Sequence, residues 1–258
     1  MVIADRFKSR PGAETVRLPS GGEMTLAVEH AAAILVNEQT AFRVVCTPEL
    51  LPQLALGRLL TEGWITCADE VEQIAVCAEG LKVSVHLTHP LEAAAAGQEV
   101  PSCCTDNLTV ASPVKLRPLA PVPQREIPDE WVETLAAAMG DELPLYRATH
   151  AVHSCFLLRD GKILYQCEDL GRHNALDKAV GCALAEGVQL GECVLYTSGR
   201  VPVDMVRKAI RAGVPALVSK TMPTVQSLEL AEAYGLKLLI RKKKSFPAAA
   251  RKIRECSD

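Results

Sequence analysis

Residues 168–178 read Glu168-Asp169-Leu170-Gly171-Arg172-His173-Asn174-Ala175-Leu176-Asp177-Lys178 and decide the fold of this chain. A β-rich run, residues 162–167, precedes them after an Asp160-Gly161 turn, and apolar residues at helical spacing follow them. The stretch therefore predicts the junction of a strand with a helix. Ionisable groups at the carboxyl end of a strand lie where open α/β sheets usually bind ligands. We therefore expect a binding site here rather than a packing feature.

Strands and helices alternate after residue 128. The expected elements are a helix over 130–139, a hairpin of 151–158 and 162–167, helices over 174–186, 204–212 and 225–234, and strands over 193–198, 216–219 and 236–240. Helices of this length between strands predict crossover connections and a largely parallel sheet with a hairpin at one edge. Residues 129–258 are therefore expected to form an α/β domain.

The residues before 129 predict two further parts. Residues 1–88 read as a smaller N-terminal α+β domain, with expected strands at 24–28, 33–36, 42–46, 71–77 and 81–87. Its one helix is expected to begin with Thr47 as N-cap and Pro48 as first helical residue, and to stop at Gly63. Seven of the sixteen prolines fall within residues 89–128, which predicts a mobile linker.

Composition excludes several classes of protein. With 258 residues the chain is long enough for one large or two small domains, and its net charge of −3 gives no basic field for nucleic acid. No apolar run approaches the roughly 20 residues of a membrane span. The first ten residues lack the apolar core of a signal peptide, so we expect a cytoplasmic protein without a membrane partner.

Three strand-to-helix junctions resemble one another: residues 168–173, 197–200 and 219–224. If the strands are parallel, the junctions meet at one sheet edge, where helix N-termini attract anions. The residues there that suit phosphate are glycines, cations and hydroxyls: Gly171, Gly199, Arg172, Arg200, Lys220, Ser198, Thr221 and Thr224. The alternative stays open that these residues are helix caps and solvent-exposed arginines without a ligand. Neither a P-loop nor a dinucleotide-binding glycine motif is present.

Cysteines and histidines supply further candidates. Ten cysteines occur, but no pair has the C-x-x-C spacing of a structural zinc site, so no tightly bound zinc is expected. Cys103 and Cys104 lie in the expected linker, where an exposed thiol can exchange or carry sulfur, or be an incidental surface pair. His150 precedes a strand, and the run beginning Arg241-Lys242 is either a solvated charge run or a phosphate contact.

The motif of residues 168–178 resembles that of the formate dehydrogenase accessory sulfurtransferases, the FdhD/NarQ family. Further stretches share the likeness: 47–49, 54–57, 62–65, 149–151, 198–200, 205–209, 214–219 and 223–224. The resemblance implies a cytidine-deaminase-like three-layer α/β domain behind the smaller domain, and a homodimer. The family usually has C-x-x-C where this chain has two adjacent cysteines.

By this resemblance the chain is a sulfurtransferase and sulfur carrier. It would accept persulfide sulfur from a cysteine desulfurase on Cys103, with Cys104 as accessory thiol. It would pass the sulfur to the molybdenum or tungsten bis-pterin guanine dinucleotide cofactor that formate dehydrogenase requires. The residues expected to bind this cofactor, or a guanine nucleotide, are Glu168, Asp169, Gly171, Arg172, His173, Ser198, Gly199, Arg200, Ser219, Thr221, His150, Ile240, Arg241 and Lys242.

Two rival functions stay open. One is a non-catalytic chaperone that binds the molybdenum cofactor and hands it on. The other is a nucleotide-modifying hydrolase of deaminase type, although the zinc-deaminase signature is missing.

Overall fold

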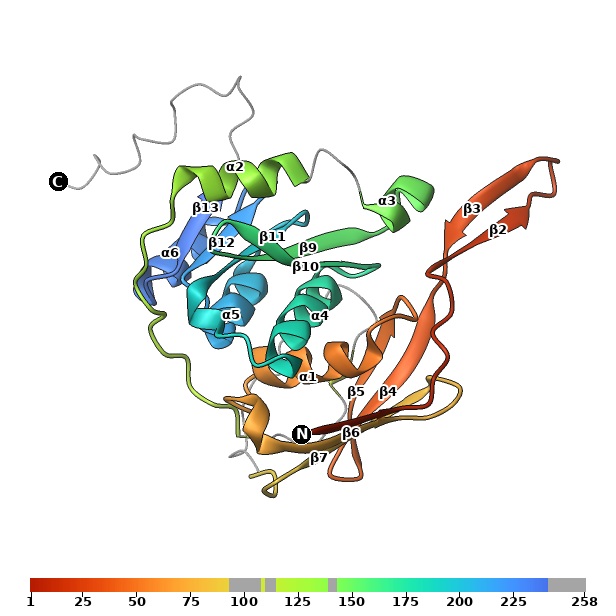
Figure 1. The fold of residues 1–258 in the computed structure, drawn as a ribbon, viewed down its shortest axis with the longest axis horizontal. Coiled ribbons are helices and arrows are strands. Elements are labelled where there is room, and N and C mark those ends of the chain that lie inside the picture. The colour runs from red at the N-terminus through yellow and green to blue at the C-terminus, as the bar shows by residue number, and fades with distance from the viewer. Residues whose placement is uncertain (93–107, 110–114, 139–142, 241–258) are drawn as a thin grey trace.

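A five-stranded sheet forms the centre of the C-terminal half. The computed structural model describes residues 1–92, 108–109, 115–138 and 143–240. The strand order is β10-β9-β11-β12-β13, and only β9 runs antiparallel to its neighbours (Figure 1). The bounds are β9 His153–Arg159, β10 Lys162–Asp169, β11 Cys193–Thr197, β12 Ala216–Ser219 and β13 Lys237–Ile240. The predicted α/β class and edge hairpin are confirmed.

Helices cover both faces of this sheet. On one face α2 (Asp129–Ala138) places Trp131 and Leu135 against Phe156 and Tyr196. On the other face lie α4 (Arg172–Ala185) and α5 (Val203–Ala212), with α6 (Val225–Ala233) beside α5 and β13. The short elements are α3 (Pro144–Thr149) and the 3₁₀ turns η1 (Ala68–Glu70) and η2 (Leu190–Glu192).

A second, mixed sheet forms the N-terminal half in the order β1-β6-β7-β4-β5-β8. Its bounds are β1 Val2–Asp5, β4 His30–Val36, β5 Gln39–Cys46, β6 Val71–Val76, β7 Lys82–Leu87 and β8 Leu108–Thr109. Helix α1 (Leu51–Thr61) lies between this sheet and the pair α4 and α5 (Figure 1). One apolar core therefore runs through both halves, from Ile34 through Leu56 to Val180.

Helices α1 and α4 approach through two glycines. A methyl group added at Gly57 would lie 1.8 Å from the carbonyl oxygen of Asp177, and one added at Gly181 would lie 1.8 Å from that of Gln53. Backbone therefore packs on backbone, and no larger residue fits at either position. This contact sets how the two halves sit on each other.

Thr47 does not cap α1, contrary to the sequence-based prediction. The helix begins at Leu51, and its N-cap is Leu50 in the left-handed region, with Pro52 in the first turn. Thr47 lies before the helix because its backbone and hydroxyl groups bond to the other half of the chain, as described below. The predicted stop is correct: Gly63 has φ 80°, and its N–H and that of Trp64 bond to the carbonyls of Leu60 and Leu59 in a Schellman motif.

Part of the expected linker is packed. Strand β8 pairs with β5, and residues 115–128 run as an extended segment along the body. The Arg117 N–H donates to the carbonyl of Gly63 and the Val122 N–H to that of Tyr234, and Val122 is 4% exposed. The prediction of a mobile linker is therefore wrong for these residues, because apolar side chains among the prolines pack against the body of the protein. Residues 93–107 and 110–114 lie outside the described residues.

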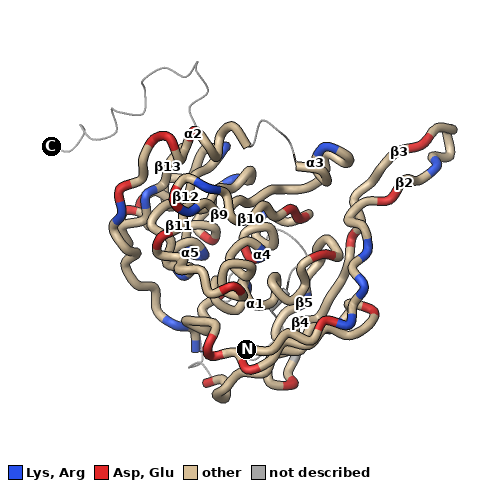
Figure 2. Tube along the Cα trace, viewed as in Figure 1, with Lys and Arg blue, Asp and Glu red and all other residues tan. Residues whose placement is uncertain are grey.

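A two-stranded arm projects from the body. It consists of β2 (Ala13–Arg17) and β3 (Glu23–Ala27), and only β3 was predicted. Figure 2 shows charges of both signs along it. Within the described part of the chain, no helix has the length and apolarity of a transmembrane span.

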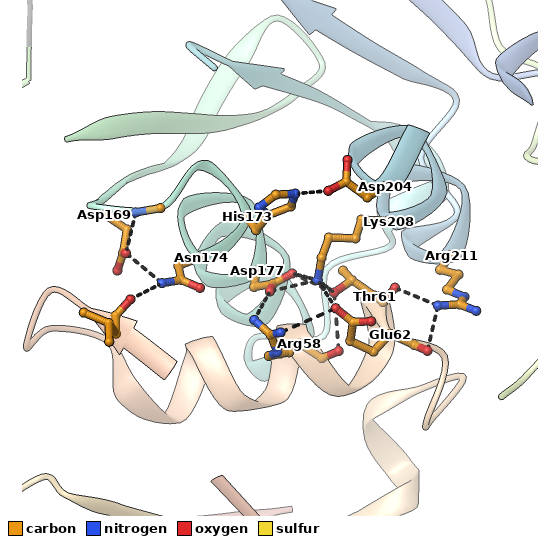
Figure 3. A network of polar contacts seen from close by, with 12 residues as sticks. Arg58, Thr61, Glu62, Asp169, His173, Asn174, Asp177, Asp204, Lys208 and Arg211 are labelled. Atoms are coloured by element: carbon orange, nitrogen blue, oxygen red, sulfur yellow. Dashed lines mark hydrogen bonds and ion pairs between the residues drawn. The ribbon is translucent and has the colours of Figure 1, made fainter. Parts of the chain in front are cut away.

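A buried polar network holds α1, α4 and α5 together (Figure 3). The Lys208 ammonium lies 2.8 Å from Glu62 and 3.0 Å from Asp177, and it donates to the Thr61 hydroxyl at 2.8 Å. The Arg58 guanidinium lies 3.8 Å from Glu62, with its centre 5.0 Å from the Phe42 ring centroid. Charges this deep stabilise the fold only while each keeps its partner.

Acid should weaken this network at Glu62. Burial alone would raise the pKa of Glu62, but Lys208, Arg58 and Arg211 outweigh it and hold the pKa at about 2. A carboxyl group with a depressed folded pKa stabilises the fold above its unfolded value of 4.5, and this contribution disappears as pH falls towards 2. We expect Glu62→Gln to lower the free energy of unfolding on the order of 3 kcal/mol above pH 5. The deficit should shrink between pH 4.5 and 2 in urea titrations, and parallel pH curves would contradict the assignment.

Candidate functional site

The three junctions meet at one edge of the five-stranded sheet. Both β10 and β11 pair antiparallel with β9, so they run in the same direction as each other and as β12 and β13. Their carboxyl ends therefore lie together, as the sequence predicts. We call residues 168–173, 198–200 and 219–224 at this edge the rim.

Gly199 brings the first two junctions into contact. A methyl group at Gly199 would lie 2.7 Å from the Cβ atom of Arg172, so the absence of a side chain lets the arginine cross the turn. Arg172 Nε is buried, and no described residue accepts a hydrogen bond from it. An arginine with an unused donor at a binding edge suits a phosphate or carboxylate oxygen.

Hydroxyl groups shape the other two turns. The carbonyl of Gly199 accepts hydrogen bonds from Thr221 Oγ1 at 2.9 Å and Ser219 Oγ at 3.4 Å. The Ser198 hydroxyl accepts a bond from the Ser154 N–H at 2.9 Å. These bonds give Ser198, Ser219 and Thr221 a role in positioning the rim. Direct contact of their hydroxyls with a ligand stays a prediction.

Positive charge collects along the rim. Arg200 and Lys220 are exposed and Arg172 is half-buried. His153, opposite Asp169 in the sheet, has its pKa lowered by burial and by the nearby charges of Arg172 and His173. The rim therefore favours an anionic ligand.

The N-terminus of α4 adds to this preference, whereas that of α5 carries Asp204, whose Oδ1 accepts the Met205 N–H. The N-cap residues of α4 and α5 are Gly171 and Pro202, neither of which has a side chain that can accept a hydrogen bond. In α6, by contrast, the Thr224 side chain accepts from the Ser227 N–H. The first turn of α4 has neither a capping side chain at its N-cap nor an acidic residue, so the positive end of its helix dipole favours an anion.

The carboxylates of Glu168 and Asp169 bond to other parts of the protein. The Glu168 carboxylate accepts bonds from the N–H groups of Leu145 and Tyr146, which anchors the start of α3, and burial raises its pKa. The Asp169 carboxylate is fully buried, lies 2.7 Å from the Lys178 ammonium and accepts the Thr47 N–H at 3.1 Å. Both acids were predicted to touch the cofactor. The structure gives them positions that hold neighbouring elements in place.

Asn174 and Lys178 complete this link between the halves. Asn174 donates to Asp169 at 2.9 Å and to the Val45 carbonyl at 2.8 Å, and Lys178 donates to the Thr47 hydroxyl at 2.6 Å. We call Thr47, Asp169, Asn174 and Lys178 the interdomain clamp. The last three belong to the motif of residues 168–178, whose local sequence does not indicate this role, and Thr47 carries no local signal for a partner 122 residues away.

His173 pairs with Asp204, which the sequence analysis did not propose as a site residue. Their atoms Nε2 and Oδ2 lie 2.6 Å apart, and the His173 side chain is 1% exposed (Figure 3). Burial alone would raise the pKa of Asp204, but the bond to His173 lowers it. The pair ties the first turn of α4 to that of α5, so it fixes two sides of the rim.

The remaining predicted residues lie around the rim or outside the described chain. His150 ends α3 in the left-handed region, with its ring against Tyr146. Ile240 pairs in register with Ser219 and therefore lies at the same sheet edge. Cys103, Cys104, Arg241 and Lys242 lie outside the described residues. The part of the chain described here contains no group of three His, Cys, Asp or Glu side chains arranged to hold a metal ion.

Comparisons with known proteins cover most of the chain. The model of the FdhD/NarQ family matches residues 27–246. A sulfur carrier protein FdhD of Nocardia farcinica is 33% identical over 243 residues, covering 87% of this chain and 86% of the relative. The sulfur carrier protein FdhD of Listeria monocytogenes serotype 4b is 28% identical over 220 residues, covering 83% of this chain and 84% of the relative. A crystal structure described as a formate dehydrogenase accessory protein, from Desulfotalea psychrophila, superposes with a TM-score of 0.68 at 28% identity, covering 90% and 91%.

Proposed function

This chain belongs to the FdhD/NarQ family, and from that membership we propose that it is a sulfur carrier required for formate dehydrogenase activity. Its sulfur would come from a cysteine desulfurase and be held as a persulfide on Cys103. The receiving substrate would be the molybdenum or tungsten bis-pterin guanine dinucleotide cofactor. The proposal includes a cytoplasmic homodimer with a cytidine-deaminase-like C-terminal domain.

The chemistry of the rim supports an anionic, phosphorylated substrate. Arg172, Arg200 and Lys220 supply cations, and the N-terminus of α4, which has no capping side chain, adds the positive end of its helix dipole. Arg172 Nε is a buried donor without a partner among the described residues, which an oxygen of a bound phosphate would satisfy. The residues present therefore fit a dinucleotide-type substrate held by its phosphates.

The place of β8 beside β5 carries the proposal, because β8 begins four residues after Cys104. Strand β8 pairs antiparallel with β5, with Leu108 opposite Arg43, so Leu108 is the end of β8 nearer to Thr47. Cys104 is four residues from Leu108, which limits their Cα separation to about 14 Å. Arg43 and Thr47 are also four residues apart along the chain, about 13 Å. Thr47 contacts Asp169, which lies at the base of the rim. The chain between Cys104 and Leu108 is therefore long enough for the thiols to reach the rim.

The transfer follows simple thiol chemistry. The Cys103 thiolate attacks the outer sulfur of the desulfurase persulfide, becomes a persulfide itself and releases the desulfurase thiolate. Release of that sulfur as sulfide needs two electrons. A second thiol, either Cys104 or one from solution, supplies them by forming a disulfide with Cys103. Positioning by the rim would contribute most of the rate enhancement.

Persulfide loading tests the role of Cys103. After incubation with desulfurase and cysteine, mass spectrometry should find an added sulfur on the parent protein and on Cys104→Ala, and none on Cys103→Ala. Cys67→Ala, which removes an exposed thiol elsewhere, is the matched control and should load normally. Loading of Cys103→Ala to the parent level would contradict the proposal.

Calorimetry with guanosine diphosphate tests the rim. Arg172→Ala and Arg200→Ala should each weaken binding about 10-fold or more, because each removes a charged donor. Lys162→Ala, at the opposite end of β10, should bind as the parent does. If Arg172→Ala and Arg200→Ala bind guanosine diphosphate with the affinity of the parent, the nucleotide binds elsewhere.

The second candidate function is a cofactor-binding chaperone. It is favoured because much of the rim suits the binding of an anionic ligand. In that case Cys103→Ala and Cys104→Ala would leave maturation of formate dehydrogenase intact, while Arg172→Ala would abolish it. A deaminase-type hydrolase is the third, and stoichiometric zinc in the purified protein would favour it.

A further inference from the structure

Three large apolar side chains at the start of α6 lie exposed beside the rim. Met222, Val225 and Leu228 are 68%, 64% and 45% exposed. Helix α6 buries Ser227 and Ala231, whereas Val225 and Leu228, one turn apart, remain outside. We call Met222, Val225 and Leu228 the α6 patch. A group of exposed apolar side chains beside a binding edge indicates a surface that another segment covers.

Hydrogen bonds fix the turn that carries the α6 patch. The Thr224 side chain accepts the Ser227 N–H at 3.2 Å, and the Ser227 hydroxyl donates to the Val201 carbonyl at 2.8 Å. Val201 and Pro223 also form a β-bridge. The start of α6 is therefore tied to the turn after β11 while the patch stays exposed.

The C-terminal segment, residues 241–258, starts close to the α6 patch. Ile240, the residue before it, pairs in register with Ser219 on the next strand, about 5 Å away. Met222 follows Ser219 by three residues, which adds at most about 11 Å. Six residues of extended chain after Ile240 span up to about 20 Å. Phe246 is therefore within covalent reach of the patch.

The charge and apolar pattern of the C-terminal segment match this surface. The segment contains seven Lys and Arg residues against two Asp and Glu residues, in a chain whose net charge is −3. Helix α6 carries Glu229 and Glu232 and neither Lys nor Arg. Phe246, Ala250 and Ile253 recur at intervals of four and three residues, a spacing that predicts one apolar side, and cations surround Ile253. An apolar side flanked by cations complements an apolar patch beside carboxylates.

We propose that residues 246–254 dock on the α6 patch of the same chain, with their apolar side chains on the patch and their cations beside Glu229. Docking would hold residues 241–244, four cations in a row, at the sheet edge that carries the rim. The inference does not rest on the sulfur-carrier proposal, since it uses neither cysteine of the proposed persulfide site. Residues 247–258 also lie beyond the match to the family model.

Carbodiimide cross-linking of the full chain tests the contact. The reagent joins a carboxylate to a neighbouring amine as an amide, with loss of one water. After trypsin digestion, residues 221–237 form the peptide that contains Glu229, and residues 252–254 form one that contains a cross-linked Lys252. We expect these two peptides to be joined. Absence of this product, or joining of 252–254 to a peptide from another element, would overturn the proposal.

Variants test the apolar part of the contact. Leu228→Gln and Ile253→Gln should each lower the yield of the joined peptides about 5-fold, because each removes an apolar side chain without changing charge. Leu164→Gln, at an exposed apolar position on β10, is the matched control and should give the parent yield. A parent yield from Leu228→Gln and Ile253→Gln would contradict docking on the patch.

Two further measurements define the occupant. In a mixture of ¹⁵N-labelled and unlabelled protein, joined peptides should be wholly labelled or wholly unlabelled, and peptides of mixed mass would show that the segment docks on a second copy instead. Leu228→Gln should also raise the initial rate of tryptic cleavage after Arg254 about 5-fold, because docking protects the segment. An unchanged cleavage rate would contradict the proposal.

Discussion

Gly57→Ala is expected to prevent stable folding or to reduce the free energy of unfolding by at least about 3 kcal/mol. The added methyl group would lie 1.8 Å from the carbonyl oxygen of Asp177 and 2.8 Å from the N–H nitrogen of Gly181. Both atoms belong to the backbone of α4 and cannot rotate away, so the helices must separate. The higher helix propensity of alanine, worth about 1 kcal/mol, is smaller than this cost. Soluble yield and urea unfolding measure the loss.

Gly187→Ala is the matched control for Gly57→Ala. It adds the same methyl group where no atom lies within 4 Å, at a φ of 69°, so it reports the backbone cost alone, about 1 kcal/mol. Gly181→Ala should behave like Gly57→Ala, because its methyl group would meet the Gln53 carbonyl at 1.8 Å. A Gly57→Ala protein that unfolds at the same urea concentration as the parent would mean that the two helices are not in contact.

Breaking the interdomain clamp from one side should cost about 3–5 kcal/mol. In Asp169→Asn, the Lys178 ammonium stays fully buried 2.7 Å from a neutral amide instead of a carboxylate. In Lys178→Met, the Asp169 carboxylate keeps only its bonds to N–H and hydroxyl donors, such as those of Thr47 and Gly171. Each single change leaves one buried charge without its counter-charge, and urea unfolding at pH 7 measures the loss.

The double variant Asp169→Asn/Lys178→Met distinguishes pairing from simple loss of contacts. It buries no charge at this place, so it should be clearly more stable than the sum of the two single losses predicts. Additive losses would show that the two charges do not interact. Lys115→Met, which breaks the exposed pair of Lys115 with Glu92, should change stability little, because solvent screens that pair.

Local sequence was sufficient to predict the elements around the rim. The Asp160-Gly161 turn has positive φ at both residues, 49° and 75°, as the predicted tight turn requires. Strand β12 has the predicted bounds, and α4, α5 and α6 begin and end within two residues of the predicted ones. Gly63 ends α1 as predicted, because it adopts the positive φ that glycine allows. These features depend on residues that neighbour one another in the chain.

Local sequence was not sufficient for Thr47 or Asp169. A threonine before a proline is a good helix cap by local rules, yet here its N–H and hydroxyl bond to an acid 122 residues away. An acid beside glycine and arginine looks like a ligand contact, yet its carboxylate is buried and fully engaged within the protein. Bonds between distant segments follow only from the packing of the two halves.

The chain by itself determined its alternation of strands and helices, its turns and the convergence of three junctions at one sheet edge. Periodicity, turn residues and strand direction are properties of short segments, so they can be read from one sequence. Tertiary structure alone decided that Gly57 and Gly181 let two helices touch, that β8 pairs with β5, and that Asp169, Asn174 and Lys178 of the motif belong to the interdomain clamp. The reason is that burial and pairing depend on which surfaces meet, and side-chain type does not specify the partner.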